Sequence, residues 1–235
     1  FVGLKSRTDH NPNGEGMGID FPVIEQAVLF GASEEVPPTV LMAEQFVGET
    51  GLGIASEIMC PDTQLPFYEG RIPKGLFLPW NPAIDQSGWS VRQMANIASR
   101  NDWTIGLKNG KWLGEPLEQV NQPNSETVTA MERTWQGLAS FARDLNCSVV
   151  FIHRGVDVPD KGDYRNAPVH EVVKRLAKKV PDAGRFFDPS HILGPKMRDD
   201  IVRATVDAMR MTVGNEFLYT GILVETGASL TDTDQ

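Results

Sequence analysis

Apolar residues fall along this chain in short runs, and the stretches between the runs mix apolar and polar residues at helical spacing. The apolar runs predict strands at residues 1–4, 53–59, 75–80, 103–107, 147–153, 185–187 and 216–224. The intervening stretches predict helices at residues 19–30, 38–48, 87–100, 123–145, 167–179 and 196–211. In the helix at 123–145, Ser125 stands ahead of Glu126 as the predicted N-cap.

The strand-like runs are almost continuously apolar rather than alternating, which is typical of strands buried on both faces of a parallel sheet. The chain starts without Met on a run that already resembles a strand. Seven strands after such a start suggest an α/β protein, a (β/α)8 TIM barrel that lacks its first strand here. We therefore expect one barrel domain over residues 1–235, carrying strands 2 to 8. A doubly wound open sheet is the main alternative, but no glycine-rich nucleotide fingerprint follows the first strand.

The composition indicates which kinds of partner and which cellular compartment to expect. The 235 residues are 40% hydrophobic and 23% charged, with a net charge of −9, so we expect no nucleic-acid partner. No apolar run approaches the ~20 residues of a membrane span, and no signal-peptide pattern is present. Cys60 and Cys147 are expected at opposite ends of their strands, too far apart for a disulfide. We expect a cytoplasmic homo-oligomer that acts on small molecules and contacts no membrane.

Three apolar runs end in a chemically useful residue that is soon followed by glycine. Asp188-Pro189-Ser190-His191 follows the run at 185–187, Lys108 follows the run at 103–107, and Glu225 follows the last run. In a barrel of parallel strands such residues converge on the rim at which these folds perform chemistry.

Several of these side chains are suited to anions. Lys5-Ser6-Arg7-Thr8 places two cations and a hydroxyl at the end of the first run, where they suit a phosphate, although a solvated loop is the alternative. Lys108 could bind phosphate or carboxylate, transfer a proton or form a Schiff base, or could be an ordinary rim lysine. Arg154 could be a second anion anchor, while His153 before it could be structural or functional.

An imidazole and carboxylates at the last two strand ends suggest a metal site. His191, Glu225 and Asp232 form a set that suits a divalent metal such as Mn, Fe, Co or Zn. Asp234 competes with Asp232 for the carboxylate role, and an ordinary polar rim is the alternative interpretation.

Taken together, these motifs resemble the class I metal-dependent 3-deoxy-D-arabino-heptulosonate 7-phosphate (DAHP) synthases over most of the chain. The resembling segments follow one another in the family's order: Lys5-Ser6-Arg7-Thr8, Ala55-Ser56-Glu57, Ile105-Gly106-Leu107-Lys108-Asn109-Gly110, His153-Arg154-Gly155, Tyr164-Arg165-Asn166, Asp188-Pro189-Ser190-His191, Val224-Glu225 and Ser229-Leu230-Thr231-Asp232.

The resemblance implies condensation of phosphoenolpyruvate with an aldose phosphate, erythrose 4-phosphate, in aromatic amino acid biosynthesis. It implies catalytic roles for Lys108 and His191, and a metal held by His191, Glu225 and Asp232. The substrate-binding residues that it implies are Lys5, Arg7, Thr8, Glu57, Lys108 and Arg154. A metal-dependent aldolase acting on another 2-keto acid and a non-catalytic family member remain alternatives.

The sequence departs from the family's pattern at three places. The family's first metal ligand, a cysteine on the first barrel strand, is absent, and Cys60 is a conceivable substitute. No arginine appears over residues 80–85, near which the family's phosphate-binding Gly-Ala-Arg motif falls, although Arg71 or Lys74 could compensate. Ser6 stands where the first motif has proline.

Overall fold

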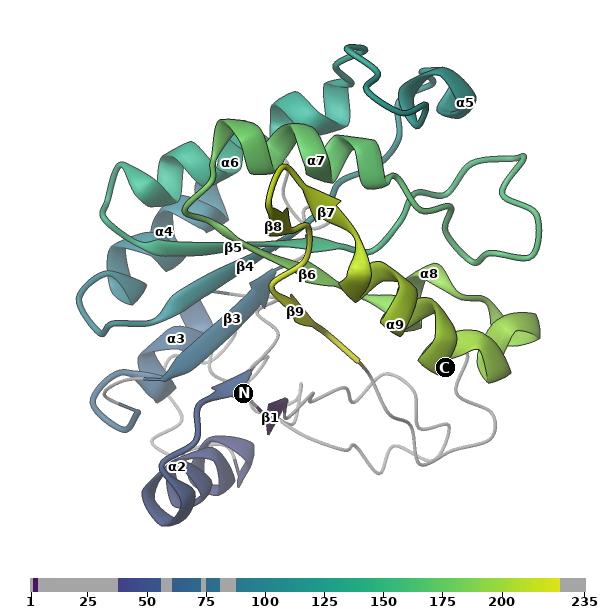
Figure 1. Ribbon diagram of the computed structural model, residues 1–235. Helices are drawn as coiled ribbons and strands as arrows, with labels where there is room; N and C mark the ends of the chain where they lie inside the picture. Colours follow the sequence, from purple (N-terminus) through teal and green to yellow (C-terminus); the bar gives the residue numbers. More distant parts are fainter. Residues whose placement is uncertain (1, 4–37, 56–60, 73–74, 81–87, 225–235) are drawn as a thin grey trace. The chain divides into compact units, whose positions relative to one another are not determined.

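The computed structural model describes residues 2–3, 38–55, 61–72, 75–80 and 88–224, and within them the chain is mixed α/β (Figure 1). The strands are β1 (Val2–Gly3), β2 (Ile54–Ala55), β3 (Leu76–Trp80), β4 (Thr104–Lys108), β5 (Ser148–His153), β6 (Gly184–Phe187), β7 (Thr212–Val213), β8 (Glu216–Phe217) and β9 (Gly221–Ile222). The helices are α2 (Pro38–Thr50), α3 (Pro61–Tyr68), α4 (Trp89–Ala98), α5 (Leu117–Val120), α6 (Ala130–Arg143), α7 (His170–Lys179), α8 (Pro189–Ile192) and α9 (Ile201–Arg210), with a 3-10 helix at Pro195–Asp200. None of the helices in this part of the chain combines the length and apolar character needed to cross a bilayer.

The strands pair in chain order, β1-β2-β3-β4-β5-β6-β9, with β7 and β8 forming a separate hairpin. The pairs β1–β2, β2–β3, β5–β6 and β6–β9 are all parallel. The residues of β3 are buried throughout, and β4 and β5 are buried after their first residue. This confirms the predicted parallel sheet with helical crossovers, because strands covered on both faces need continuous apolar runs.

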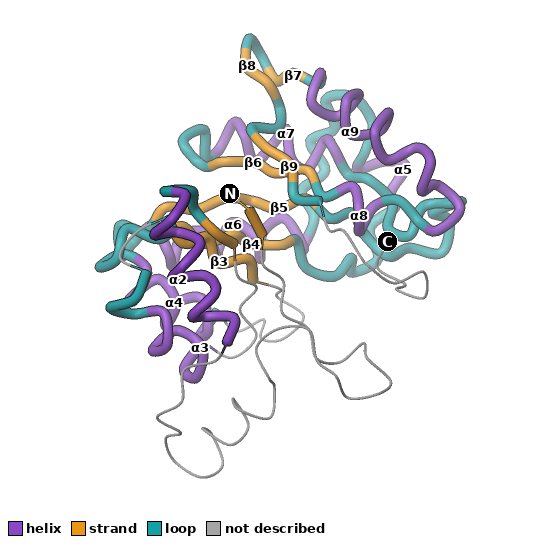
Figure 2. Tube along the Cα trace, turned by 90° about the horizontal axis from the view of Figure 1, so that it is seen from below, coloured by secondary structure: helices purple, strands orange, loops and turns teal. Residues whose placement is uncertain are grey.

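The chain divides into two compact units, residues 1–106 with 141–148, and residues 107–140 with 149–235. In the first unit α2, α3 and α4 lie beside the strands (Figure 2). The Trp103 indole donates to the carbonyl of Ile72 at 2.8 Å, which anchors the start of β4. Cys147 is a buried free thiol, and burial raises its pKa to about 11, against the lowering effect of a backbone hydrogen bond from Ile105.

In the second unit α7 packs an apolar face formed by Val172, Val173, Leu176 and Ala177. The buried guanidinium of Arg185 in β6 donates hydrogen bonds to four backbone carbonyls. Its Nε and Nη1 reach Leu218 and Ala183, each at 2.8 Å. This fan of hydrogen bonds joins the amino end of β6 to the segment between β8 and β9.

Two predicted elements are wrong in their extent, the first being the helix at 123–145. Helix α6 begins only at Ala130, because the Thr129 hydroxyl accepts the backbone N–H of Glu132 at 2.9 Å and caps the helix there. Ser125, the predicted cap, lies in the preceding loop, where its hydroxyl accepts from the backbone of Thr127 at 3.3 Å.

The predicted strand at 216–224 is two strands in different sheets. β8 pairs antiparallel with β7, and only β9 joins the parallel sheet. The hairpin forms because Gly214, at φ +59°, takes the first position of a two-residue loop, a conformation for which glycine is favoured.

Helices α3, α5 and α8 were not predicted, and the predicted helix at 19–30 lies outside the described residues. The described elements fit repeating β/α units, but eight such units in one closed barrel domain stay a prediction.

Candidate functional site

The Asp188-Pro189-Ser190-His191 motif forms a helical turn directly after β6. Asp188 is the N-cap of α8 and Pro189 is its first residue, a position at which proline is favoured because no N–H is needed. Oδ1 of Asp188 accepts the backbone N–H of His191 at 3.1 Å. The turn brings the imidazole back onto its own cap, so that Nδ1 of His191 lies 2.8 Å from Oδ2 of Asp188.

Lys108 belongs to the same charged cluster. The side chains of Lys108, Asp188 and His191 are all almost completely buried. Burial alone would raise the pKa of Asp188, but the charge and hydrogen bonds of His191, together with the charge of Lys108, outweigh it and hold that pKa below its usual value. The cluster therefore contains an ionised carboxylate at neutral pH, with the charge of Lys108 nearby.

Backbone hydrogen bonds bring the ends of three strands together at this cluster. The Asp188 amide donates to the carbonyl of His153 at 3.0 Å, and the Asn109 amide donates to the carbonyl of Ile152 at 3.1 Å. The Asn109 side chain accepts from the Arg154 amide at 2.8 Å and donates to the carbonyl of Gly155 at 2.7 Å. Lys108, Arg154 and Asp188 thus follow one another around the carboxyl ends of β4, β5 and β6.

The loop between β5 and α7 holds the α8 turn from outside. Nδ2 of Asn166 donates to the carbonyl of His191 at 2.6 Å. The backbone amides of Arg165 and Asn166 both donate to the carbonyl of Ile192, at 3.0 and 3.2 Å. The backbone on both sides of His191 is therefore tied to this loop.

His153 points into a buried chain of hydrogen bonds. Its Nε2 accepts the backbone N–H of Val169 at 3.0 Å, so its Nδ1 must carry the proton of the neutral ring. Nδ1 then donates to the Tyr219 hydroxyl at 2.6 Å, and that hydroxyl donates to Nδ1 of His170 at 2.8 Å. The Phe187 ring contacts all three aromatic side chains.

These groups are held neutral. Burial, and then the neighbouring His170, lowers the pKa of His153 well below its usual value. Burial lowers the pKa of His170 to about 4, with Lys174 adding to the lowering and Glu171 opposing it. Burial raises the pKa of Tyr219 well above its usual value. The geometry gives His153 a structural role in joining β5, α7 and the segment before β9.

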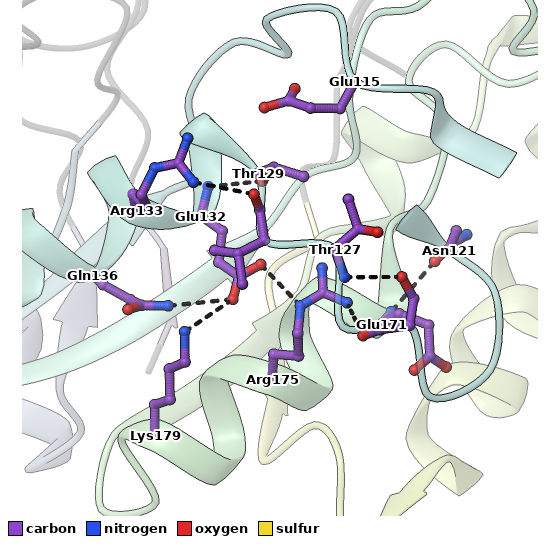
Figure 3. A network of polar contacts seen from close by, with 12 residues as sticks. Glu115, Asn121, Thr127, Thr129, Glu132, Arg133, Gln136, Glu171, Arg175 and Lys179 are labelled. Atoms are coloured by element: carbon purple, nitrogen blue, oxygen red, sulfur yellow. Dashed lines mark hydrogen bonds and ion pairs between the residues drawn. The ribbon is translucent and has the colours of Figure 1, made fainter. Parts of the chain in front are cut away.

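A second charged network lies between α6 and α7 (Figure 3). The fully buried Glu132 accepts from Nε of Arg175 at 2.9 Å, and Nζ of Lys179 lies 3.5 Å from its other oxygen. Arg175 also donates to the carbonyl of Ser125 at 2.8 Å. This network fixes α6 against α7.

Of the residues predicted for the site, Lys108, Arg154 and His191 are described; Asp188 contacts His191, and the charge of Lys108 acts on the Asp188 carboxylate. The other predicted residues lie outside the described residues: Lys5, Arg7, Thr8, Glu57, Glu225 and Asp232. Within the described ranges no three His, Cys, Asp or Glu side chains gather as a metal site. The predicted metal site therefore depends on positions that are not described.

Sequence reasoning gave no role to Asp188, Asn109 or Asn166. A signal for Asp188 was present, since an Asp-Pro-x-His sequence combines an N-cap with proline at the first helical position. Asn109 and Asn166 act through contacts with distant residues, for which one sequence gives no signal.

Neither a comparison with protein-family models nor a search of curated proteins finds a match to this chain.

Proposed function

We propose that the chain catalyses a DAHP synthase-like condensation of phosphoenolpyruvate with an aldose phosphate, as part of a (β/α)8 barrel. The observation that carries this proposal is the buried cluster of Lys108, Asp188 and His191 at the carboxyl ends of β4 and β6. Parallel α/β folds place their chemistry at these strand ends. Burying a charged lysine costs free energy unless an opposite charge lies nearby, and in this cluster the Asp188 carboxylate supplies one.

The two cations at the ends of β4 and β5 suit the first substrate. Lys108 and Arg154 would bind the carboxylate and phosphate of phosphoenolpyruvate, while Lys5, Arg7 and Thr8 would bind the aldose phosphate. Glu57 is proposed as a further substrate-binding residue. In a buried site these fixed charges stabilise developing negative charge far more than in water. Holding two anionic substrates together also removes much of the entropic cost of a bimolecular step.

The bond changes are those of an aldol-like condensation. C3 of phosphoenolpyruvate forms a bond with the aldehyde carbon, and the aldehyde oxygen takes up a proton to become a hydroxyl. Water adds at C2, and the bond to phosphate then breaks, which gives a 3-deoxy-2-keto sugar acid phosphate and inorganic phosphate.

The donor set suits a divalent metal as far as it is described. One ring nitrogen of His191 faces a carboxylate, which is common among metal-bound histidines. We propose Glu225 and Asp232 as the remaining ligands and Mn, Fe, Co or Zn as the ion. Such an ion, when bound, would supply Lewis-acid polarisation of the aldehyde.

The direct test is release of inorganic phosphate from phosphoenolpyruvate in the presence of erythrose 4-phosphate and Mn²⁺. We expect release that needs all three components, and a loss of about 100-fold or more in kcat/KM for Lys108→Met, because the variant lacks a charge-assisted contact in a buried site. Lys111→Met, which removes an exposed lysine three positions further on, is the matched control and should behave as wild type. A folded protein that releases no phosphate would contradict the proposal.

A metal-dependent aldolase acting on another 2-keto acid is the second candidate, and Trp80 favours it. This indole is fully buried at the carboxyl end of β3, near the position of the family's phosphate-binding arginine, and among the described residues its N–H has no hydrogen-bond acceptor. Turnover of pyruvate without phosphate release would support this candidate. No turnover, with no metal by elemental analysis, would favour a non-catalytic role.

A further inference from the structure

Helix α9 carries two exposed apolar side chains on one face. Of its ten residues, all within the described part of the chain, Ala208 alone is buried. Val202 and Val206 lie about one helical turn apart on a side turned away from Ala208, and they are 74% and 41% exposed. Removing these two side chains from water would favour packing of this face against another surface.

Charged residues flank the two valines. Arg203 and Asp207 are exposed and lie on the same face of α9, four positions apart. The Arg203 guanidinium contacts Asp200 at the start of its own helix, and an exposed pair of this kind contributes little to stability. Asp199 and Arg210 are also exposed, at opposite ends of the helix. The face therefore has acidic and basic side chains on both sides of an apolar centre.

This order of side chains is self-complementary in an antiparallel helix pair. In a two-fold dimer each contact occurs twice, because the same surface is used by both copies. With the axis between Ala204 and Thr205, three pairs come close to the same level: Val202 with Val206 of the partner subunit, Arg203 with the partner subunit's Asp207, and Arg210 with the partner's Asp199. A parallel pair would instead set each charge against its own copy.

We propose that α9 forms the interface of a homodimer, in which α9 of one copy packs antiparallel against α9 of its partner across a two-fold axis. The valines form the apolar centre, and the opposite charges fix the orientation. Ten helical residues span about 15 Å, so this surface is smaller than the ~800 Å² that each partner contributes to a standard interface. We therefore expect a reversible dimer with a dissociation constant in the micromolar range.

Charge reversals test the pairing, with sedimentation velocity at a series of protein concentrations as the measurement. Arg203→Asp sets two carboxylates against each other twice in the dimer, and Asp207→Arg does the same with two guanidinium groups. We expect each change to raise the dissociation constant at least about 10-fold, because like charges repel across an interface. The first change makes the chain more negative and the second less negative, so net charge cannot explain a loss in both.

An equal mixture of the two variants separates pairing from general damage. In the mixed dimer the carboxylate introduced at position 203 meets the guanidinium introduced at position 207, and the native Asp207 meets the native Arg203. Both contacts are attractive again, so we expect the mixture to dimerise almost as strongly as wild type. Lys178→Asp reverses an exposed charge on α7 and is the matched control for Arg203→Asp, with wild-type dimerisation expected.

A wild-type chain that stays monomeric at every concentration would overturn the proposal and indicate a different partner for this face. A dimer that survives both reversals, or a mixture no stronger than its components, would also overturn it. If either single variant does not fold, the double variant Arg203→Asp with Asp207→Arg decides, because its pairs form with the two roles exchanged. These measurements need neither substrate nor metal, so their outcome is independent of the condensation assay.

Discussion

Gly155 occupies a position that a side chain cannot share. Its φ is +73°, and an added Cβ would lie 2.6 Å from the carbonyl oxygen of Asn166 and 2.9 Å from that of Ala167. This close approach lets Val156 and Ala167 form their antiparallel bridge. The loop that fixes the backbone of His191 therefore begins at a residue that has to be glycine.

We expect Gly155→Ala to lower the free energy of unfolding by about 2–5 kcal/mol, because left-handed strain and overlap with backbone atoms add together. Gly162→Ala is the matched control. Gly162 also has a positive φ, +62°, but nothing lies within 4 Å of its added Cβ, so we expect a loss of about 1–2 kcal/mol from strain alone. Urea unfolding of both variants measures the difference, and equal losses would show that the overlap is relieved by movement of the loop.

At the scale of elements, α6 and α7 are joined by one buried carboxylate. Glu132 is 0% exposed, while the side chain of Arg175 is 12% exposed. A buried charge that loses its partner lowers the free energy of unfolding, so removal of either Glu132 or Arg175 should destabilise the protein.

We expect Glu132→Gln to lower the free energy of unfolding by about 3 kcal/mol, because Arg175 would keep its charge without a carboxylate. Glu126→Gln, on the exposed part of the preceding loop, should have almost no effect. The double variant Glu132→Gln with Arg175→Met should recover part of the loss. If it loses as much as the two single variants together, the two side chains are not coupled.

The sequence predicted those elements whose burial is visible in a short run of residues. The continuous apolar runs of β3, β4 and β5 indicated strands covered on both faces, and the structure confirms them. The start of α6 was missed because Ser125 and Thr129 both suit an N-cap, and only the contacts of Arg175 with Ser125 and Glu132 separate them. In the site, Lys108 and His191 were predicted from their places at strand ends. The carboxylate between them was not, because the pairing depends on the α8 turn.

For the whole molecule, the neutral histidines make stability depend on pH. The pKa of His170 falls from 6.5 to about 4 on folding, and that of His153 also falls. Between these values the unfolded chain binds more protons than the folded one, so stability is complete above pH 6.5 and declines as the pH falls toward 4.

Protonation of His170 alone should lower the free energy of unfolding by about 3 kcal/mol between pH 6.5 and pH 4. Urea unfolding at several pH values between 4 and 7 measures it. We expect the free energy of unfolding of His170→Gln to change less steeply with pH, because the variant has one fewer group that takes up a proton on unfolding. A slope in this variant equal to that of wild type would contradict the assignment, since Asp188, with its lowered pKa, titrates below this range.

The two ends of the short strand β6 differ in role. Arg185 near its start donates to main-chain carbonyl oxygens, whereas Asp188 just past its end contacts His191 of the proposed site. Engineering for heat resistance can therefore concentrate on the surroundings of Arg185, and changes to the proposed site can begin at the opposite end of the strand.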